Sequence, residues 1–197
     1  MGKYTAIADI DNALVTLLRN NLVPETVANP ALIDLCLPFD KGDVALGLYL
    51  YDVKESEGIR LTEKINVDSS VQMYPPIMLT LYYMLTAYST SDIKFRAADD
   101  HRLLGRAMQT FYDNAVIKLA DFGIQNRSVI TDVRVEMLNM ELEDKMKIWA
   151  FPNMPYRLSV CYKVGPVEIE SLRTRTVRRV VDMQMRFEDS EPRENAE

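Results

Sequence analysis

The chain has 197 residues, of which 48% are hydrophobic and 26% charged, and its formal net charge is −6. This length and balance fit one globular domain with its own core, and they exclude a collagen-like, coiled-coil, disulfide-scaffold or largely disordered protein. With 7 glycines and one histidine, His101, the chain also has few residues for phosphate-binding loops or histidine-based catalysis.

The first half of the chain predicts one helix followed by strands. Apolar residues recur at steps of three and four over residues 5–21, which indicates an amphipathic helix. Apolar side chains alternate over residues 33–37 and again over 46–53, and this pattern is typical of strands. The polar stretch 54–74 predicts a long loop, and a third strand is predicted over residues 77–88.

The second half predicts a further helix and the remaining strands. Helical spacing returns over residues 97–116, and a short helix is expected over 141–151. Alternating apolar residues predict strands at 133–137, 158–162 and 181–187. Helices and strands do not alternate regularly, so we expect an α+β fold with a mixed or antiparallel sheet and helices packed on one face.

The net charge is distributed unevenly along the chain. Residues 1–90 carry a net charge of −5, residues 91–187 carry +3 and residues 188–197 carry −4. We expect a single domain over residues 1–187, followed by an acidic, mobile tail over 188–197. The local basic cluster consists of Arg173, Arg175, Arg178 and Arg179. A solvated strand face or a subunit contact explains it better than phosphate binding, and no nucleic-acid partner is expected.

The cysteines and the N-terminus indicate an intracellular protein. Cys36 and Cys161 lie in apolar, strand-like runs, which predicts two buried thiols in a reducing compartment. Together with His101 they are too few to bind a metal ion, and no cofactor is expected. Asp9 and Asp11 interrupt the apolar stretch near the N-terminus, so a secretory signal is excluded. No apolar run is long enough to cross a bilayer, and we expect cytoplasmic assembly without membrane insertion.

The strongest candidate for catalysis is the sequence Asp9-Ile10-Asp11-Asn12. It resembles the DxDx[TV] start of haloacid-dehalogenase-type phosphatases, in which the first aspartate is the nucleophile and the second is the acid/base. Here Ala13 occupies the last position of the motif, and the helical spacing places the two carboxylates about 200° apart around a helix. We therefore expect Asp9 and Asp11 to be exposed near the positive end of the helix dipole, and a phosphatase remains the least favoured alternative.

Two further groups of polar and aromatic residues suggest other functions. The consecutive residues 99–101, two aspartates and a histidine, would diverge on a helix, so we expect acids at the helix start followed by an exposed or interface histidine. Tyr49, Tyr51 and Tyr83 could line a groove, which makes a small-molecule or peptide-binding module the second alternative. Walker, GxGxxG, GxSxG, HExxH and paired CxxC motifs are missing from the sequence.

Several segments, in their order and spacing, resemble one family. They are IADIDNALVTLL near the N-terminus, LYLYDV at 48–53, PPIMLTLYYMLTAY at 75–88, DHRLLGRAM at 100–108, and the pair IW and PYRLSVCY within 148–162. This set is similar to the tail-cap or tube-terminator proteins of phage-tail-like contractile injection systems, of the antifeeding-prophage and virulence-cassette type. The resemblance extends over about residues 4–187.

The resemblance implies a structural protein without catalytic activity. Family members form a hexameric ring on the baseplate-distal end of the inner tube, stop tube growth and join the last sheath layer. The expected partners are therefore further copies of the chain, the inner tube protein and the sheath protein. Some members carry an additional C-terminal domain, which we expect to be absent here. Gly105, within the 100–108 motif, would allow another element to approach closely.

A ring also needs surfaces that bind a neighbouring copy. The negative first half and the mildly positive second half would suit a head-to-tail contact between subunits. We expect the loop 55–74 and the basic cluster to reach neighbouring subunits or the tube. The candidate contact residues are Glu55, Glu57, Arg60, Glu63, Lys64, Arg173, Arg175, Arg178 and Arg179.

Overall fold

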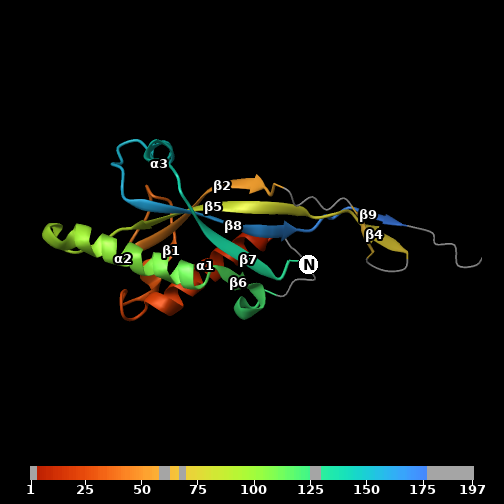
Figure 1. The fold of residues 1–197 in the computed structure, drawn as a ribbon, viewed down its shortest axis with the longest axis horizontal. Helices are drawn as coiled ribbons and strands as arrows, with labels where there is room; N and C mark the ends of the chain where they lie inside the picture. Colours follow the sequence, from red (N-terminus) through yellow and green to blue (C-terminus); the bar gives the residue numbers. More distant parts are fainter. Residues whose placement is uncertain (1–3, 58–62, 67–69, 125–129, 177–197) are drawn as a thin grey trace, which may run out of the picture.

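The computed structural model describes residues 4–57, 63–66, 70–124 and 130–176, which form a body and a projecting arm (Figure 1). The helices are α1 (Ala6–Leu22), α2 (Ile93–Asp113) and α3 (Leu142–Ile148), with 3-10 turns at Pro30–Leu32 and Leu119–Phe122. The strands are β1 (Ile33–Leu35), β2 (Leu46–Glu55), β3 (Ile65–Asn66), β4 (Val71–Met73), β5 (Ile77–Ala87), β6 (Val116–Lys118), β7 (Asp132–Leu138), β8 (Ser159–Ile169) and β9 (Thr174–Thr176).

The body is built on a six-stranded sheet in the order β1-β2-β5-β8-β7-β6. The pair β1 and β2 is parallel, and each other neighbouring pair is antiparallel. The long strands β5 and β8 occupy the centre, where their apolar residues are protected on both faces. The mixed sheet and its packed helices confirm the predicted α+β class.

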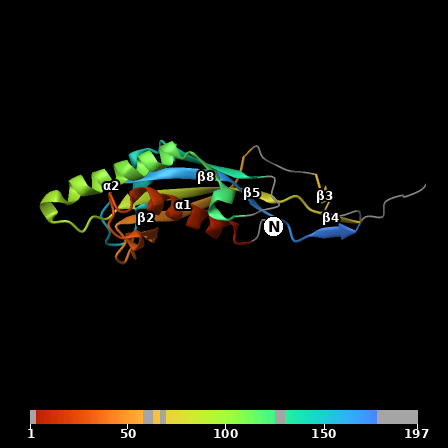
Figure 2. The same ribbon diagram turned by 90° about the horizontal axis from the view of Figure 1, so that it is seen from below.

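Helices α1 and α2 cover one face of this sheet (Figure 2). The apolar stripe of α1, which includes Ile10, Leu14 and Leu18, is buried there as the spacing of these residues predicts. From the sheet, Tyr83 and its cross-strand partner Tyr162 face the same core. This cluster is the main hydrophobic core of the protein.

The opposite face of the sheet is covered by the chain around α3 (Figure 1). Met84 and its partner Cys161 lie on this face beneath Trp149, which directly follows α3. The indole Nε1 of Trp149 donates a hydrogen bond to Ser159 Oγ at 3.0 Å, so the buried polar atom of the ring has a partner. The prediction of helices on one face therefore describes α1 and α2, while α3 belongs to a second, smaller core.

The largest differences from the predicted elements concern α2, the loop 54–74 and β8, which extends to Ile169 where the prediction ends at 162. Helix α2 begins at Ile93, four residues before the predicted start, because the backbone carbonyl of Asp92 already accepts the N–H groups of Phe95 and Arg96. The predicted loop contains the short strands β3 and β4, which pair with each other, and β4 also pairs with β9. The predicted strand 181–187 and the tail 188–197 lie outside the described residues, and the single domain over 1–187 stays a prediction.

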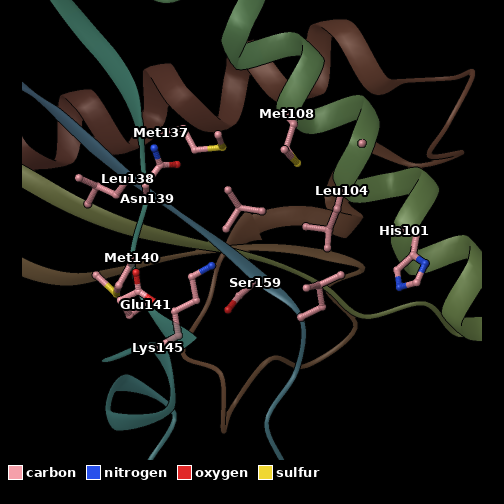
Figure 3. Close-up of a pocket in the computed structure, with 13 residues that line it drawn as sticks. His101, Leu104, Met108, Met137, Leu138, Asn139, Met140, Glu141, Lys145 and Ser159 are labelled. Atoms are coloured by element: carbon pink, nitrogen blue, oxygen red, sulfur yellow. The ribbon is translucent and has the colours of Figure 1, made fainter. Parts of the chain in front are cut away.

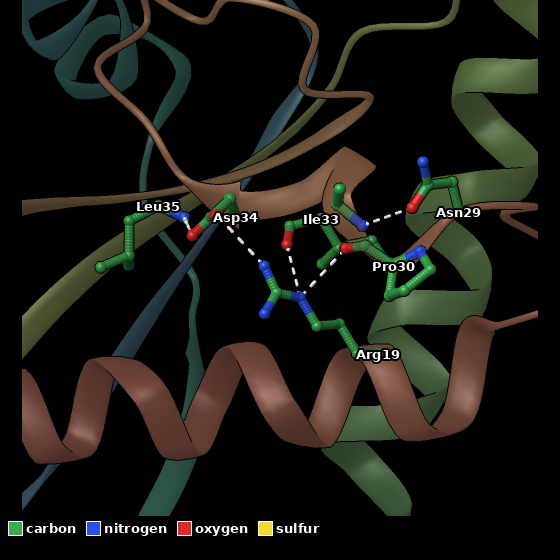
Figure 4. A network of polar contacts seen from close by, with 7 residues as sticks. Arg19, Asn29, Pro30, Ile33, Asp34 and Leu35 are labelled. Carbon is green, nitrogen blue, oxygen red and sulfur yellow. Dashed lines mark hydrogen bonds and ion pairs between the residues drawn. The ribbon is translucent and has the colours of Figure 1, made fainter.

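Arg19 joins α1 to the edge strand β1 (Figure 4). Its Nε donates to the carbonyl oxygens of Pro30 at 3.0 Å and Ile33 at 2.9 Å. Its terminal Nη2 forms an ion pair with Asp34 Oδ2 at 3.1 Å. One guanidinium group thus fixes the 3-10 turn and the start of the parallel strand against the helix.

We expect Arg19→Ala to lower the free energy of unfolding by about 2 kcal/mol, because it removes three hydrogen bonds donated by one charged group. Arg19→Lys should lose most of this contribution as well, since an ammonium group cannot reproduce the planar fork of the guanidinium. Urea unfolding of the two variants measures the effect. An unchanged midpoint for Arg19→Ala would contradict this role.

Candidate assembly surface

A three-stranded arm extends from one end of the body (Figure 1). Its strands have the order β3-β4-β9, and all neighbouring pairs are antiparallel. The arm continues the two central strands, since β4 precedes β5 and β9 follows β8 along the chain. At the junction Tyr74 N–H donates to Arg173 C=O at 3.0 Å. The arm is therefore tied to the most protected part of the sheet.

The described strand residues of the arm include no buried side chain. Those of β4 are half-buried, and all three residues of β9 are exposed. None of these strand residues belongs to either hydrophobic core. A sheet of this size normally needs a hydrophobic face for stability of its own. The apolar side chains of this arm, Ile65, Val71 and Met73, are only half-buried, which is typical of a surface that packs against another chain.

Two cations flank one aromatic ring at the base of the arm. Lys64 Nζ lies 5.1 Å from the centroid of the Tyr74 ring, and Arg173 Cζ lies 4.2 Å from it. Both distances suit cation–π attraction, which offsets part of the repulsion between the two positive charges. The structure thus brings together two predicted contact residues from distant parts of the sequence, on a ring that the sequence interpretation missed.

The other candidate contact residues are spread along the same end of the molecule. Arg175 is exposed on β9 opposite Gln72, and Glu63 is exposed beside Lys64. Glu55 ends β2 opposite Leu79 of β5, and Glu57 lies near the junction of body and arm. Three candidates lie outside the described residues, namely Arg60, Arg178 and Arg179. A contact role for all nine residues stays a prediction.

The sequence signal that could have revealed the arm is short. Residues 71–74 read Val-Gln-Met-Tyr, an apolar–polar alternation directly before Pro75-Pro76. Four residues are few for a strand prediction, and β3 has two. The pairing of these strands with β9 depends on residues about one hundred positions away, which local patterns do not report.

The structure corrects the expectation that Asp9 and Asp11 are exposed. Both are half-buried inside α1, and residues 4 to 8, the described part of the chain before them, form no strand of the kind that the phosphatase motif requires. Asp9 Oδ2 accepts from Thr5 Oγ1 at 3.0 Å, and Asp11 Oδ1 accepts from the fully buried Tyr83 hydroxyl at 2.6 Å. These contacts explain both aspartates as structural groups of α1.

Burial raises the pKa of the Asp11 carboxyl above its ordinary value, although the hydrogen bond from Tyr83 acts in the opposite direction. A carboxyl whose pKa is raised on folding binds its proton more tightly in the folded state. Its contribution to stability is therefore fully present below the unfolded pKa and is lost as the pH rises through the folded pKa.

We expect Asp11→Asn to remove this pH dependence while keeping an oxygen that accepts from Tyr83. The stability of the parent protein relative to the variant should decrease between about pH 3 and pH 6, as measured by urea unfolding at several pH values. Hydrogen bonds from Ser91 and Lys163 lower the pKa values of Asp99 and Glu136, so these two groups make stability rise with pH. Both proteins contain them, and their contributions cancel when the two stabilities are subtracted. A stability of the parent protein that rises with pH relative to Asp11→Asn would contradict a raised pKa for Asp11.

Asp99 and Asp100 do not lie at the start of α2, where they were predicted. Asp99 and Asp100 lie well inside the helix and reach back to the preceding turn, where they accept from Ser91 Oγ and Ser89 N–H at 2.5 and 2.6 Å. The prediction of acids at the helix start is therefore wrong, whereas His101 is exposed as expected. Gly105 is also exposed, with no atom of the described chain within 4 Å of where its Cβ would be, so no element of this chain approaches it.

The three tyrosines of the predicted groove do not share one face. The register pairs Tyr49 with Met84 and Leu50 with Tyr83, so Tyr49 lies on the Trp149 side and Tyr83 on the helix side of the sheet. Tyr51 packs with Tyr49 in the smaller core, and burial raises the pKa of its phenol. The groove expected for a small molecule or peptide at these residues is not formed.

The two thiols are held in environments that keep them protonated. Cys161 is buried and Cys36 half-buried, both are free, and burial raises the pKa of both thiols, that of Cys36 to about 11. Such thiols are poor nucleophiles at neutral pH. Among the described residues, no three His, Cys, Asp or Glu side chains are grouped to hold a metal ion. No helix in the described ranges has the length and apolar character needed to cross a membrane.

A mixed six-stranded sheet with two helices on one face and a projecting arm defines an α+β protein. The sequence profile of the Pvc16 N-terminal domain family matches residues 9–182, and the chain belongs to this family. No sequence among the curated proteins matches it.

Two solved structures share the fold. One is a sheath/tube terminator of an extracellular contractile injection system, PVC, in the extended state, with a TM-score of 0.62 and 17% identity over 93% of this chain and 64% of that chain. The other is the anti-feeding prophage tube-terminating cap, with a TM-score of 0.62 and 22% identity over 91% of this chain and 61% of that chain. The chain thus spans less than two thirds of the length of either protein.

Proposed function

We propose that this protein is the cap of a contractile injection system, a structural protein that forms a ring on the end of the inner tube. The ring is a hexamer placed on the baseplate-distal end, where it ends tube growth and joins the last layer of sheath. The protein assembles in the cytoplasm and acts without catalysis, cofactor or metal.

The observation that carries this proposal is the family match over residues 9–182, together with the fold shared with two tube-terminating proteins. The arm supports it independently, because its three strands project from the body without burying any strand side chain. A protein whose task is to cover a tube end needs such surfaces. The uneven charge of the two halves of the chain is also suited to a head-to-tail contact between copies.

Electron microscopy of the full-length protein mixed with tubes of its cognate tube protein tests the proposal. Rings are expected at one end of the tubes, and tubes assembled in the presence of the protein should be shorter. Classification of the end views gives the number of subunits. The tail outside the described residues is kept, since the arm leads directly into it.

A strict monomer that never joins tube ends would overturn the proposal. Rings at both ends of the tube, or along its wall, would contradict the terminating role but would still support the formation of a ring. An unrelated acidic protein of similar size serves as the control for nonspecific adsorption to the tube.

A further inference from the structure

An apolar groove runs between α2 and β7 (Figure 3). Its larger part has a volume of about 570 Å³ and is lined by Leu104 and Met108 of α2, Met137 of β7, and Leu158 and Val160 near β8. A second hollow of about 460 Å³ shares Met108 and Met137 with the first and continues toward Tyr112. The two hollows therefore form one continuous groove with Met137 between them.

The side chains of this groove are unusually exposed for their type. Tyr112 is 84% exposed, and Met137 and Leu158 are each 51% exposed. Methionine and tyrosine are enriched where proteins bind one another, because they offer large and adaptable contact surfaces. The groove is thus a site where apolar area is available to an incoming chain.

The outer edge of β7 is open along this groove. Strand β6 pairs with β7 from Asp132 to Arg134, and one further bond joins Val135 N–H to Ala115 C=O at 2.8 Å. Backbone groups alternate between the two edges of a strand, so the N–H and C=O groups of Met137 point to the same side as those of Val135. On this outer edge no strand among the described residues pairs with β7 beyond Val135, whereas β8 pairs with its inner edge as far as Leu138.

An open strand edge between two apolar hollows fits an extended segment that adds one more strand. In this mode main-chain hydrogen bonds hold the segment, and alternate side chains fill the hollows. Residues 181–187 of the chain read Val-Asp-Met-Gln-Met-Arg-Phe, with apolar residues at every second position. We propose that residues 181–187 of a second copy of this chain pair with the outer edge of β7 and fill the groove.

The position of the arm explains why a second copy supplies the segment. Met137 pairs with Tyr162, which lies seven residues before the end of β8 and therefore about 23 Å from that end along the strand. The arm projects beyond this end of β8 (Figure 1), and the paired residues Thr174 to Thr176 of β9 alone add about 7 Å, which puts Thr176 about 30 Å or more from Met137. Gln184, the centre of the segment, follows Thr176 by eight residues, which span about 27 Å at most. The segment of one copy falls short of its own groove.

This contact is heterologous, because the arm side of one copy binds the groove side of the next. Repeated contacts of this type generate a closed ring when the rotation between copies closes. The inference rests on the proposed ring and deepens it, since it names the contact that joins the subunits.

Disulfide trapping between two full-length variants tests the contact. One variant carries Met137→Cys, and the other, with a larger N-terminal tag, carries Met183→Cys or Met185→Cys. A mild oxidant accepts the two electrons and two protons released as the Sγ–Sγ bond forms. Mixed dimers should form at least about fivefold faster than with Gln184→Cys, whose side chain points to the opposite face of an extended strand.

Tyr4→Cys replaces Met137→Cys as the matched control, because Tyr4 is 91% exposed and is not a groove residue. The parent protein gives the background from Cys36 and Cys161. Equal rates for positions 183, 184 and 185 would overturn the inference, and so would rates no higher than those with Tyr4→Cys. A chain that carries both Met137→Cys and Met183→Cys should not crosslink internally on dilution, and an internal disulfide would also overturn it.

The outcome is separable from that of the proposed function. Rings at tube ends without specific crosslinks would refute this contact and leave the cap intact. Specific crosslinks without any binding to tube ends would establish the contact and refute the cap.

Discussion

Trp149→Ala is expected to lower the free energy of unfolding by about 3 to 5 kcal/mol, the range for removal of a large aromatic side chain from a core. Trp149 is 3% exposed and covers Met84 and Cys161 on the face of the sheet that α1 and α2 do not reach. Its ring also contacts Phe151 and Tyr156. The smaller core therefore depends on this one side chain.

Ser159→Ala is the matched control for Trp149→Ala, because it removes the hydrogen bond to the indole and keeps the ring. It should cost about 1 kcal/mol, plus the penalty for leaving the indole N–H buried without a partner. Urea unfolding followed by tryptophan fluorescence measures Ser159→Ala, and circular dichroism measures Trp149→Ala. Equal losses for the two variants would show that packing of the ring contributes little.

Reversing two charges at the base of the arm is expected to abolish capping while leaving the body folded. In the double variant Lys64→Glu, Arg173→Glu, two carboxylates replace the cations that flank Tyr74. If the arm binds an acidic partner surface, like charges would meet and the number of capped tube ends should fall about tenfold or more. The melting temperature should change little, since the arm strands bury no side chain. Counts of capped ends in micrographs provide the measurement.

The double variant Lys94→Glu, Lys118→Glu controls for net charge, because it changes the charge by the same amount at exposed positions of α2 and β6. Its capping should remain as in the parent protein. Unchanged capping by the arm variant would refute the role of Lys64 and Arg173 and leave the family assignment in place. Loss of capping in both variants would attribute the effect to overall charge.

The sequence predicted the elements whose pattern is long and regular. Helix α1 and strands β2 and β5 were placed correctly because their apolar residues are set by packing against one core, whereas only the first part of β8 was predicted. The arm strands β3, β4 and β9 escaped prediction, since no core imposes a pattern on them. The environment of Asp11 depends on Tyr83, seventy-two positions away, and a local pattern does not contain this contact.

The candidate contact residues were chosen from charge and position in the sequence, and their contact role stays a prediction. Lys64 and Arg173 were expected to reach partners as members of a loop and of a basic cluster, and both lie on the arm. The ring of Tyr74 lies between these two cations, and the sequence did not indicate this role because a single tyrosine beside two prolines has many possible roles. The groove at Met137 was missed because it combines a helix face with a strand edge, and the sequence does not show which edges remain unpaired.

The continuity of the central strands with the arm also determines how the protein would respond to force. Strands β5 and β8 are joined over nine register pairs, and the arm leaves the body along the same direction (Figure 1). Tension applied to the arm would therefore pull β5 and β8 together, and it would load the hydrogen bonds that join them to β2 and β7 in shear rather than one after another. A subunit held by its arm would therefore resist mechanical extraction most strongly along the strand axis.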